Sequence, residues 1–254
     1  MKVDRLGELA RGLNDAWARS VTVPAPSTVE PSLTVDDAYD IQELIIEARL
    51  EAGHRRAGWK MGLTSAQPPT TPIVGTLLDD MVIASGSDLS LATMIAPMVE
   101  AELVVRIGET IDRAQTLAEL SHGPHEVGPG IEVIDYRTID SSGVVDWIAD
   151  NSTVAYAVLG SFVPVADVSL AEIEAALSCG GDHLATGRGD QVMGNPLAAV
   201  AWLSQHLSER GHQLERGQVI LTGSLTGHFR VPAHEVQFTA DFGGFGNVAV
   251  RFHP

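Results

Sequence analysis

The segment from Pro97 to Arg106 constrains the fold most strongly, because it predicts a β-strand that carries acids on one face. Apolar side chains at every second position from Val99 to Val105 alternate with Glu100 and Glu102. The two carboxylates would project from the same face, about 7 Å apart along the backbone. Two like charges on an apolar strand are costly to bury unless a positive charge lies between them. Two interpretations stay open: this face lies in water, or it binds a hard divalent cation such as Mg2+.

Lysine occurs only at positions 2 and 60, and every other strongly basic residue is arginine. Lys60 lies in an apolar, glycine-containing run from Ala57 to Leu63 that predicts another strand. An ammonium group is compact and titratable, unlike a guanidinium group, so a lysine at this place favours a functional role. The alternative is a lysine whose stem packs on an apolar surface while its ammonium group reaches water.

Further polar groups accompany predicted strands. Glu132 is a third acid inside an apolar run, residues 130–137, and a period of two places Tyr136 on its face. The polar cluster at residues 149–153 precedes a predicted strand at residues 154–159. It is either a strand-entry turn or a set of hydroxyl and amide donors at the mouth of a strand.

The N-terminal part of the chain predicts two helices ahead of the first strand. Residues 3–19 place apolar side chains along one stripe. A second helix is expected to begin near Thr34, with Asp37 as the partner in an imperfect capping box. We therefore expect an N-terminal helical segment at residues 1–55 and a catalytic domain at residues 56–254.

The rest of the chain predicts three more helices, at residues 109–121, 169–177 and 196–210. It also predicts two more strands, at residues 218–223 and 247–252. The first of these helices would turn Ala114, Leu117 and Leu120 inward. Ser169 and Glu172 would form the capping box of the second.

The composition excludes several classes of function. Of the 254 residues, 44% are hydrophobic and 19% charged, which suits one large domain with a small helical appendage. The net charge of -17 argues against nucleic-acid and membrane partners. A single cysteine excludes a disulfide framework and a cysteine-based zinc site. Because the sequence shows no apolar signal core and no membrane-spanning run, we expect a soluble cytoplasmic protein.

The three acids, the lysine and the donor cluster form a coherent chemical set. A metal ion held by carboxylates can chelate a 2-oxo acid, while a lysine adds charge or moves a proton at the resulting enolate. The cation would also allow a strongly acidic protein to bind an anionic substrate.

These residues lie in segments that resemble the hydratase/decarboxylase family of aromatic meta-cleavage pathways, which is related to the C-terminal domain of fumarylacetoacetate hydrolase. The matching segments follow the order of the family over nearly the whole chain: residues 58–65, 97–102, 131–137, 149–153, 187–189, 194–197, 221–224 and 244–252. The resemblance implies an α+β fold, built as a curled mixed β-sheet roll with the N-terminal helical segment as an appendage.

The resemblance also implies the site. Glu100, Glu102 and Glu132 would bind Mg2+ or Mn2+, and Lys60 and the Thr153 hydroxyl would be catalytic. A further set is implied to bind the substrate: Gly62, Leu63, Ile73, Asp80 and Thr222. The implied partners are a small-molecule 2-oxo acid, further copies of the chain in a homo-oligomer, and a cognate hydratase.

Ile73 favours one of the two activities in the family. The resemblance implies an aspartate at this position in the hydratases of the family. The segment 71–75 of this chain, with Ile73, resembles the decarboxylase pattern instead. Hydration needs a group that activates water. Loss of CO2 mainly needs an electron sink at the 2-oxo oxygen and an apolar wall near the departing carboxylate. We therefore predict a metal-dependent decarboxylase of a 2-oxo-3-enedioate of the 4-oxalocrotonate type, which acts through a metal-bound dienolate.

Two alternatives stay open. The chain could be a hydratase of 2-hydroxypenta-2,4-dienoate or a related 2-oxo acid, with Asp79 or Asp80 replacing the missing acid, although these two acids are more typical of a solvated turn. It could also be a catalytically silent relative that acts as a binding partner. Two segments depart from the expected pattern. The proline-rich loop at residues 66–72 is shorter than the usual loop of the family, and Gly187–Gly189 resembles hydratases more than decarboxylases.

Overall fold

A computed structural model describes residues 2–65, 71–141 and 143–254, apart from the side chains of residues 2 and 3. Most of the predicted proline-rich loop, residues 66–70, lies outside the described residues. The α-helices are α1 (Lys2–Arg19), α2 (Pro26–Val29), α3 (Val35–Glu51), α4 (Leu117–His122), α5 (Val144–Ala149) and α6 (Pro196–Glu209). The first nine strands are β1 (Val23–Pro24), β2 (Arg56–Gly62), β3 (Ile73–Leu78), β4 (Val82–Ala84), β5 (Ser87–Ser90), β6 (Met98–Arg106), β7 (Glu126–Ile134), β8 (Thr138–Ile139) and β9 (Val154–Leu159). The others are β10 (Val163–Pro164), β11 (Glu174–Cys179), β12 (Asp182–Arg188), β13 (Val219–Ser224), β14 (Phe229–Arg230), β15 (Val236–Asp241) and β16 (Asn247–His253).

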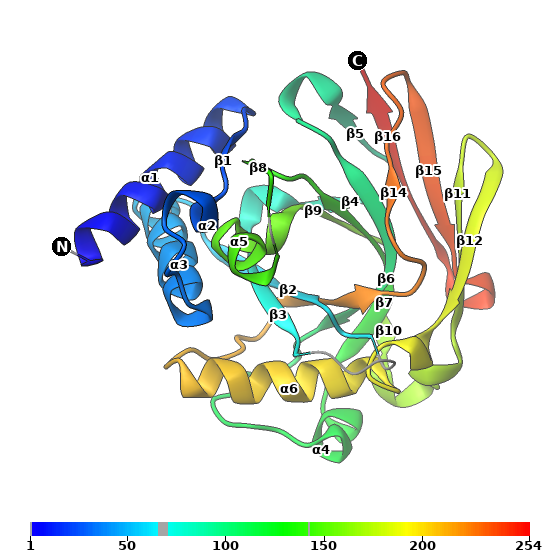
Figure 1. Ribbon diagram of the computed structural model, residues 1–254. Coiled ribbons are helices and arrows are strands. Elements are labelled where there is room, and N and C mark those ends of the chain that lie inside the picture. Colours follow the sequence, from blue (N-terminus) through cyan, green and yellow to red (C-terminus); the bar gives the residue numbers. More distant parts are fainter. Residues whose placement is uncertain (1, 66–70, 142) are drawn as a thin grey trace.

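Within the described residues, the strands form a nine-stranded sheet, a five-stranded sheet and a small pair, β1 with β8. The main path of the larger sheet runs β3-β2-β13-β6-β7-β9-β4, and it is mixed because β2 pairs with β13 in parallel while β6 and β7 are antiparallel. The smaller sheet runs β12-β11-β15-β16-β5 and stands at the right of Figure 1, beside the curled larger sheet. Helices α1, α2, α3 and α5 gather on the opposite side, and α6 lies along the lower edge. The predicted α+β class with a curled mixed sheet is confirmed.

One apolar cluster joins the sheets to the N-terminal helices. It includes Val99 and Leu103 of β6, which have no exposed surface, together with Leu13 of α1 and Ile41 of α3. Burial of such side chains contributes about 1.5–3 kcal/mol each, so the helices are anchored to the sheet by the main core. The division of the chain at residue 55 stays a prediction.

The helix predicted at residues 109–121 is wrong over most of its length. The structure has only α4 (Leu117–His122), whose N-cap residue Thr116 forms a capping box with Glu119. Leu120 is buried, but Leu117 is 39% exposed and Ala114 is also exposed. The apolar spacing was too sparse to define an inward face, and the N-cap decides where the helix begins.

The helix predicted at residues 169–177 is also wrong. Ser169 makes no capping hydrogen bond from its side chain, and a single turn at Leu170–Glu172 leads directly into strand β11. Ala175 and Leu177 are buried with a period of two, and β11 pairs with both β12 and β15. Sheet pairing on both sides therefore overrides the local helix signal.

The helices predicted at residues 3–19 and from Thr34 are confirmed as α1 and α3. Thr34 and Asp37 form a complete capping box, in which the Thr34 hydroxyl accepts a hydrogen bond from the Asp37 amide at 3.2 Å. None of the helices in the described ranges combines the length and the apolar character that crossing a membrane requires.

Candidate active site

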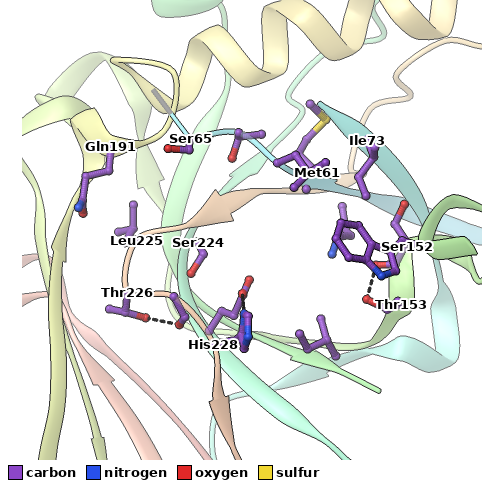
Figure 2. A pocket seen from close by; sticks show the side chains of 18 of the residues that line it. Met61, Ser65, Ile73, Ser152, Thr153, Gln191, Ser224, Leu225, Thr226 and His228 are labelled. Atoms are coloured by element: carbon purple, nitrogen blue, oxygen red, sulfur yellow. Dashed lines mark hydrogen bonds and ion pairs between the residues drawn. The ribbon is translucent and has the colours of Figure 1, made fainter. Parts of the chain in front are cut away.

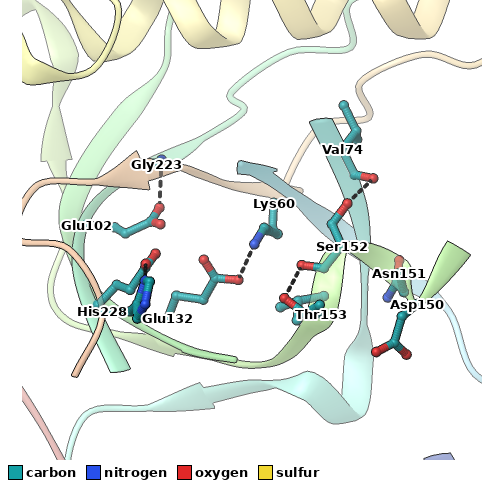
Figure 3. Close-up of polar contacts among 12 residues, drawn as sticks. Lys60, Val74, Glu102, Glu132, Asp150, Asn151, Ser152, Thr153, Gly223 and His228 are labelled. Carbon is teal, nitrogen blue, oxygen red and sulfur yellow. Dashed lines mark hydrogen bonds and ion pairs between the residues drawn. The ribbon is translucent and has the colours of Figure 1, made fainter. Parts of the chain in front are cut away.

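Pairing between β6 and β7 brings the three predicted acids together. Glu100 lies directly opposite Glu132 in the antiparallel register, and Glu102 follows on the same face of β6. One oxygen of each carboxylate lies within 4.8 Å of the others. Glu102 and Glu132 have no exposed surface, so the interpretation of a strand face lying in water is excluded. Figure 3 shows Glu102 and Glu132 pointing into one space, with Lys60 beside them.

Lys60 is carried to this cluster by the parallel pairing of β2 with β13. Its backbone lies opposite Leu221, which in turn lies opposite Val104 of β6. The Lys60 side chain is buried, and its Nζ lies 3.1 Å from Glu132 Oε1. The lone internal lysine thus faces the acids, which a functional role requires. A lysine whose ammonium group reaches water would not lie here.

The buried charges change one another's protonation. Burial raises the pKa of Glu132 to about 7, although Lys60 opposes the shift. Burial, and then the neighbouring Glu132 and Glu100, raise the pKa of Glu102 well above its usual value. Burial alone would lower the pKa of Lys60, but the three carboxylates outweigh it and raise that pKa. Without a cation, these shifts favour proton uptake by the two buried carboxyl groups.

The donor set fits a hard divalent cation. Among the described residues, Glu102 Oε1 and Glu132 Oε2 are buried without a hydrogen-bond partner, whereas Glu102 Oε2 accepts one from the Gly223 amide at 2.8 Å. A buried charged oxygen without a partner costs more than about 1–3 kcal/mol. Carboxylate oxygens are the ligands that Mg2+ and Mn2+ prefer, so a cation would satisfy these atoms at once.

His228 is a residue of the site that the sequence analysis missed. Its Nδ1 lies 3.5 Å from Glu100 Oε1, its side chain is 57% exposed, and it lines the cavity described below. The hydrogen bond to Glu100 raises the pKa of His228. The residue lies on the short connection between β13 and β14, where no hydrophobic period marks which side chains face inward.

The polar cluster before β9 forms a strained turn. Asn151, Ser152 and Thr153 all have left-handed backbones, with φ of 50°, 48° and 62°. Such a conformation is uncommon for residues other than glycine and a true outlier for a β-branched threonine. Each such residue costs about 1–3 kcal/mol, so the surrounding structure must enforce the turn.

Side-chain hydrogen bonds to β3 supply part of that enforcement. The Asn151 amide accepts from the Thr76 backbone N–H at 2.7 Å and donates to the Thr76 carbonyl at 2.9 Å. The Ser152 hydroxyl donates to the Val74 carbonyl at 2.8 Å. The turn also approaches Gly75 so closely that a Cβ there would lie 2.6 Å from the Asn151 carbonyl oxygen. Glycine at this position therefore allows the turn to dock.

A cavity of about 530 Å³ opens above the acids. Six of the predicted site residues line it: Lys60, Gly62, Leu63, Ile73, Glu100 and Thr153. Figure 2 shows Ser152 and Thr153 across the cavity from Leu225 and Thr226, with His228 between them at the bottom. The volume suits a small organic molecule.

The cavity wall carries two kinds of side chain. Hydroxyl and amide groups come from distant segments of the chain: Ser65, Thr186, Gln191, Ser224 and Thr226. The Ser224 hydroxyl oxygen is buried and has no hydrogen-bond partner among the described residues. The apolar side chains of the wall include Met61, Ile73, Ile134 and Trp147.

Two of the predicted substrate-binding residues are not brought to this cavity. The Thr222 side chain is fully buried and donates to the Leu103 carbonyl at 2.8 Å, on the side of β13 that faces β6. Asp80 lies in the turn after β3, with His54 Nδ1 at 3.5 Å. His54, Asp79 and Asp80 form a second cluster of metal-ligand type, but Arg55 already pairs with Asp79 at 3.2 Å. Neither Asp79 nor Asp80 lines the 530 Å³ cavity.

Three converging carboxylates and a buried lysine lie beside a cavity on a curled mixed sheet, which is the arrangement of an α+β protein whose site could hold a cation and a small molecule. Comparison with known proteins identifies the family. The chain belongs to the fumarylacetoacetate (FAA) hydrolase C-terminal family, whose sequence profile matches residues 50–252.

Two of the curated relatives, a hydratase and a decarboxylase, are lyase-type enzymes. The chain is 32% identical to 2-keto-4-pentenoate hydratase of Paraburkholderia xenovorans strain LB400, over 96% of this chain and 94% of the relative. It is 31% identical to 4-oxalocrotonate decarboxylase of Pseudomonas putida, over 96% and 95%. The resemblance to the hydratase/decarboxylase family is confirmed, and these identities do not separate the two activities.

Solved structures support the same assignment. The structure of 4-oxalocrotonate decarboxylase from Pseudomonas putida G7, complexed with magnesium and adipate, superimposes with a TM-score of 0.93 at 28% identity. The alignment covers 99% of this chain and 98% of that chain. A second structure of that enzyme, complexed with calcium and acetate, gives a TM-score of 0.92. Both neighbours therefore contain a divalent cation.

Proposed function

We propose that the chain is a divalent-metal-dependent decarboxylase of a 2-oxo-3-enedioate of the 4-oxalocrotonate type. The observation that carries the proposal is the chemistry of the cavity wall. Among the described residues that line the cavity, Glu100 is the only carboxylic acid, and it belongs to the cluster proposed to hold the cation. A hydratase needs a further acid or base to activate water and protonate carbon. A decarboxylase mainly needs an electron sink.

Glu100, Glu102 and Glu132 would hold Mg2+ or Mn2+ through the oxygens that lack protein partners. When bound, the cation supplies positive charge to the C1 carboxylate and the 2-oxo oxygen of the substrate and makes the 2-oxo group an electron sink. The electron pair of the C5–C6 bond then moves through the conjugated chain to the 2-oxo oxygen, which leaves CO2 and a dienolate.

Lys60 would stabilise the charge that develops at the 2-oxo oxygen and deliver a proton to it. Its raised pKa keeps it as an ammonium ion beside Glu132. Neutralisation of the carboxylates by a cation removes part of the field that raises this pKa, so the ammonium group becomes a better proton donor. Thr153, held at the cavity wall by the strained turn, would orient the substrate.

The apolar side chains of the cavity wall would receive the departing carboxylate. Ile73 and Trp147 are among these side chains, and no arginine lines the cavity among the described residues. A carboxylate that finds no guanidinium partner gains little ground-state stabilisation there, and conversion to neutral CO2 relieves the cost. Ile73, which stands in place of an acid, therefore serves the decarboxylase better than the hydratase.

A hydratase of 2-hydroxypenta-2,4-dienoate is the second candidate, and His228 favours it. With Asp79 and Asp80 outside the cavity, the partly exposed His228 imidazole is the remaining group placed to activate water. A catalytically silent binding partner is the third candidate, but the retained Lys60 and the converging acids argue against it. A homo-oligomer and a complex with a cognate hydratase stay predictions.

The two activities are separated by incubating the Mg2+-loaded protein with 4-oxalocrotonate and, separately, with 2-hydroxypenta-2,4-dienoate. We expect release of CO2 from the first compound and no loss of ultraviolet absorbance from the second. Loss of the dienoate absorbance without CO2 release would assign a hydratase. Turnover of neither compound, nor of any other 2-oxo acid, with Mg2+ binding intact would favour the silent partner.

A further inference from the structure

Arg137 brackets the strained turn at residues 151–153 from both ends. Its Nε lies 2.5 Å from Asp150 Oδ1, and its Nη2 donates to the Asp150 carbonyl at 2.8 Å. Both terminal nitrogens also donate to the Val154 carbonyl, at 3.4 Å. One guanidinium group therefore holds the residue before the left-handed turn and the residue after it, in a fixed planar geometry.

Trp17 of α1 covers this guanidinium group. The Arg137 Cζ atom lies 4.6 Å from the centre of the Trp17 ring, and Arg49 of α3 lies against the same ring at 4.1 Å. The ring attracts both cations and covers part of the Arg137 guanidinium group, whose side chain is 4% exposed. Trp17 and Arg49 both precede residue 50, where the match to the family profile begins.

The bracket and the contacts with β3 restrain different sides of the turn. Asn151 and Ser152 fix it to Thr76 and Val74, whereas Arg137 fixes its two ends. Water that reached Arg137 would compete with the carbonyl groups for its donors, because each of these hydrogen bonds is strong only where water is excluded. Uncovering Arg137 would then loosen the ends of the turn and leave the contacts with β3 in place.

We propose that Trp17 and Arg137 are positioning residues for the active site, which hold Ser152 and Thr153 at the cavity wall through this bracket. The first helix of the chain thus takes part in the geometry of the site as well as in the core. The catalytic consequence of this role rests on the proposed function, but the structural consequence does not.

The test compares Trp17→Leu with the matched control Trp202→Leu. Trp202 lies on α6 and stacks on His206 at 4.9 Å, so its loss removes a similar ring without touching Arg137. Arg137→Met is less useful, because it strands a buried carboxylate and threatens the fold. Three backbone N–H groups report on the turn by hydrogen exchange. The Thr153 N–H donates to the Asp150 carbonyl, and the Asp135 N–H donates to the Thr153 carbonyl. The Arg137 N–H donates to Asp150 Oδ2.

We expect Trp17→Leu to speed exchange at these amides about tenfold while the control leaves them unchanged. On 4-oxalocrotonate with Mg2+, kcat should fall about tenfold in Trp17→Leu, and the Kd for Mg2+ should stay within about twofold because the glutamates are not part of the bracket. Unchanged exchange and kcat in Trp17→Leu, or an equal effect in Trp202→Leu, would overturn the proposal. If the wild type turns over no 2-oxo acid, the proposed function fails, and the exchange comparison alone decides the positioning role.

Discussion

Replacing Glu102 with glutamine is expected to reduce turnover by about a thousandfold or more, because it removes one ligand of the cation that stabilises the transition-state charge. The same change should stabilise the metal-free protein. Glutamine keeps the acceptor for the Gly223 amide and offers an N–H donor to the neighbouring Glu132 carboxylate, in place of a carboxyl group that donates only when it is protonated. Thermal unfolding with and without Mg2+ should show a higher metal-free Tm than the wild type and a much smaller shift on adding Mg2+.

The pKa shifts of the buried acids also predict how the stability of the metal-free wild type depends on pH. A carboxyl group whose pKa is raised by folding binds its proton more tightly in the folded state, so stability falls as pH rises from the unfolded value near 4.5 through the folded value. For Glu132 that window ends at about 7. We expect Glu102→Gln, which loses one of the coupled acids, to lose less stability than the wild type as pH rises from 4.5 to about 7.

The matched control for Glu102→Gln is Glu126→Gln. Glu126 lies on β7 and pairs with Arg106 at 2.6 Å, with about two-fifths of its side chain exposed. Exposed ion pairs contribute about 0–1 kcal/mol, so this change should leave turnover and Mg2+ binding at wild-type values. If Glu102→Gln binds Mg2+ as tightly as the wild type does, Glu102 is not a ligand of the cation.

Replacing Lys60 with methionine is expected to lower kcat by about a hundredfold to ten-thousandfold, the range that a positioned proton donor contributes. Its effect on stability should be opposite to that of Glu102→Gln. Methionine leaves Glu132 without its ion-pair partner at 3.1 Å, and stranding one member of a buried pair costs about 3–5 kcal/mol before protonation relieves it. Bound Mg2+ would replace the lost charge, so the shift in Tm on adding Mg2+ should be larger than in the wild type.

Lys60→Arg separates charge from proton transfer in this experiment. Arginine keeps the positive charge but does not release a proton near neutral pH. If Lys60 acts by donating a proton, Lys60→Arg should be almost as slow as Lys60→Met while it keeps more of the metal-free stability. Recovery of most of kcat in Lys60→Arg would assign a purely electrostatic role to Lys60. A wild-type kcat in Lys60→Met would remove the residue from the reaction.

The acids and the lysine were predictable because their signals are local. A period of two fixes that Glu100 and Glu102 share a face of one strand, and the isolation of Lys60 in an apolar run marks it as unusual. The spacing of residues 130–137 marks Glu132 in the same way. That these strands are neighbours followed from the family resemblance, and the register of β6 with β7 is the finding that brings the charges together.

Other parts of the site carried no local signal. Thr186 lies on a strand of the second sheet and Gln191 follows it, and only the packing of the two sheets brings them to the cavity. The turn at residues 151–153 has positive φ at three residues that are not glycine. Positive φ is normally predicted at glycine positions, so the sequence did not indicate this turn. The segment at 169–177 shows the converse, because a plausible capping box there was outweighed by strand pairing on both sides of β11.

The central claim is that Glu100, Glu102 and Glu132 hold one cation beside Lys60. Crystals soaked with Mn2+ test it directly, because manganese scatters anomalously and binds the same oxygen ligands as Mg2+. We predict a single strong anomalous peak in contact with all three carboxylates and adjacent to the Lys60 ammonium group. A peak at His54, Asp79 and Asp80 instead, or no peak at the three glutamates in Mn2+-saturated crystals, would contradict it.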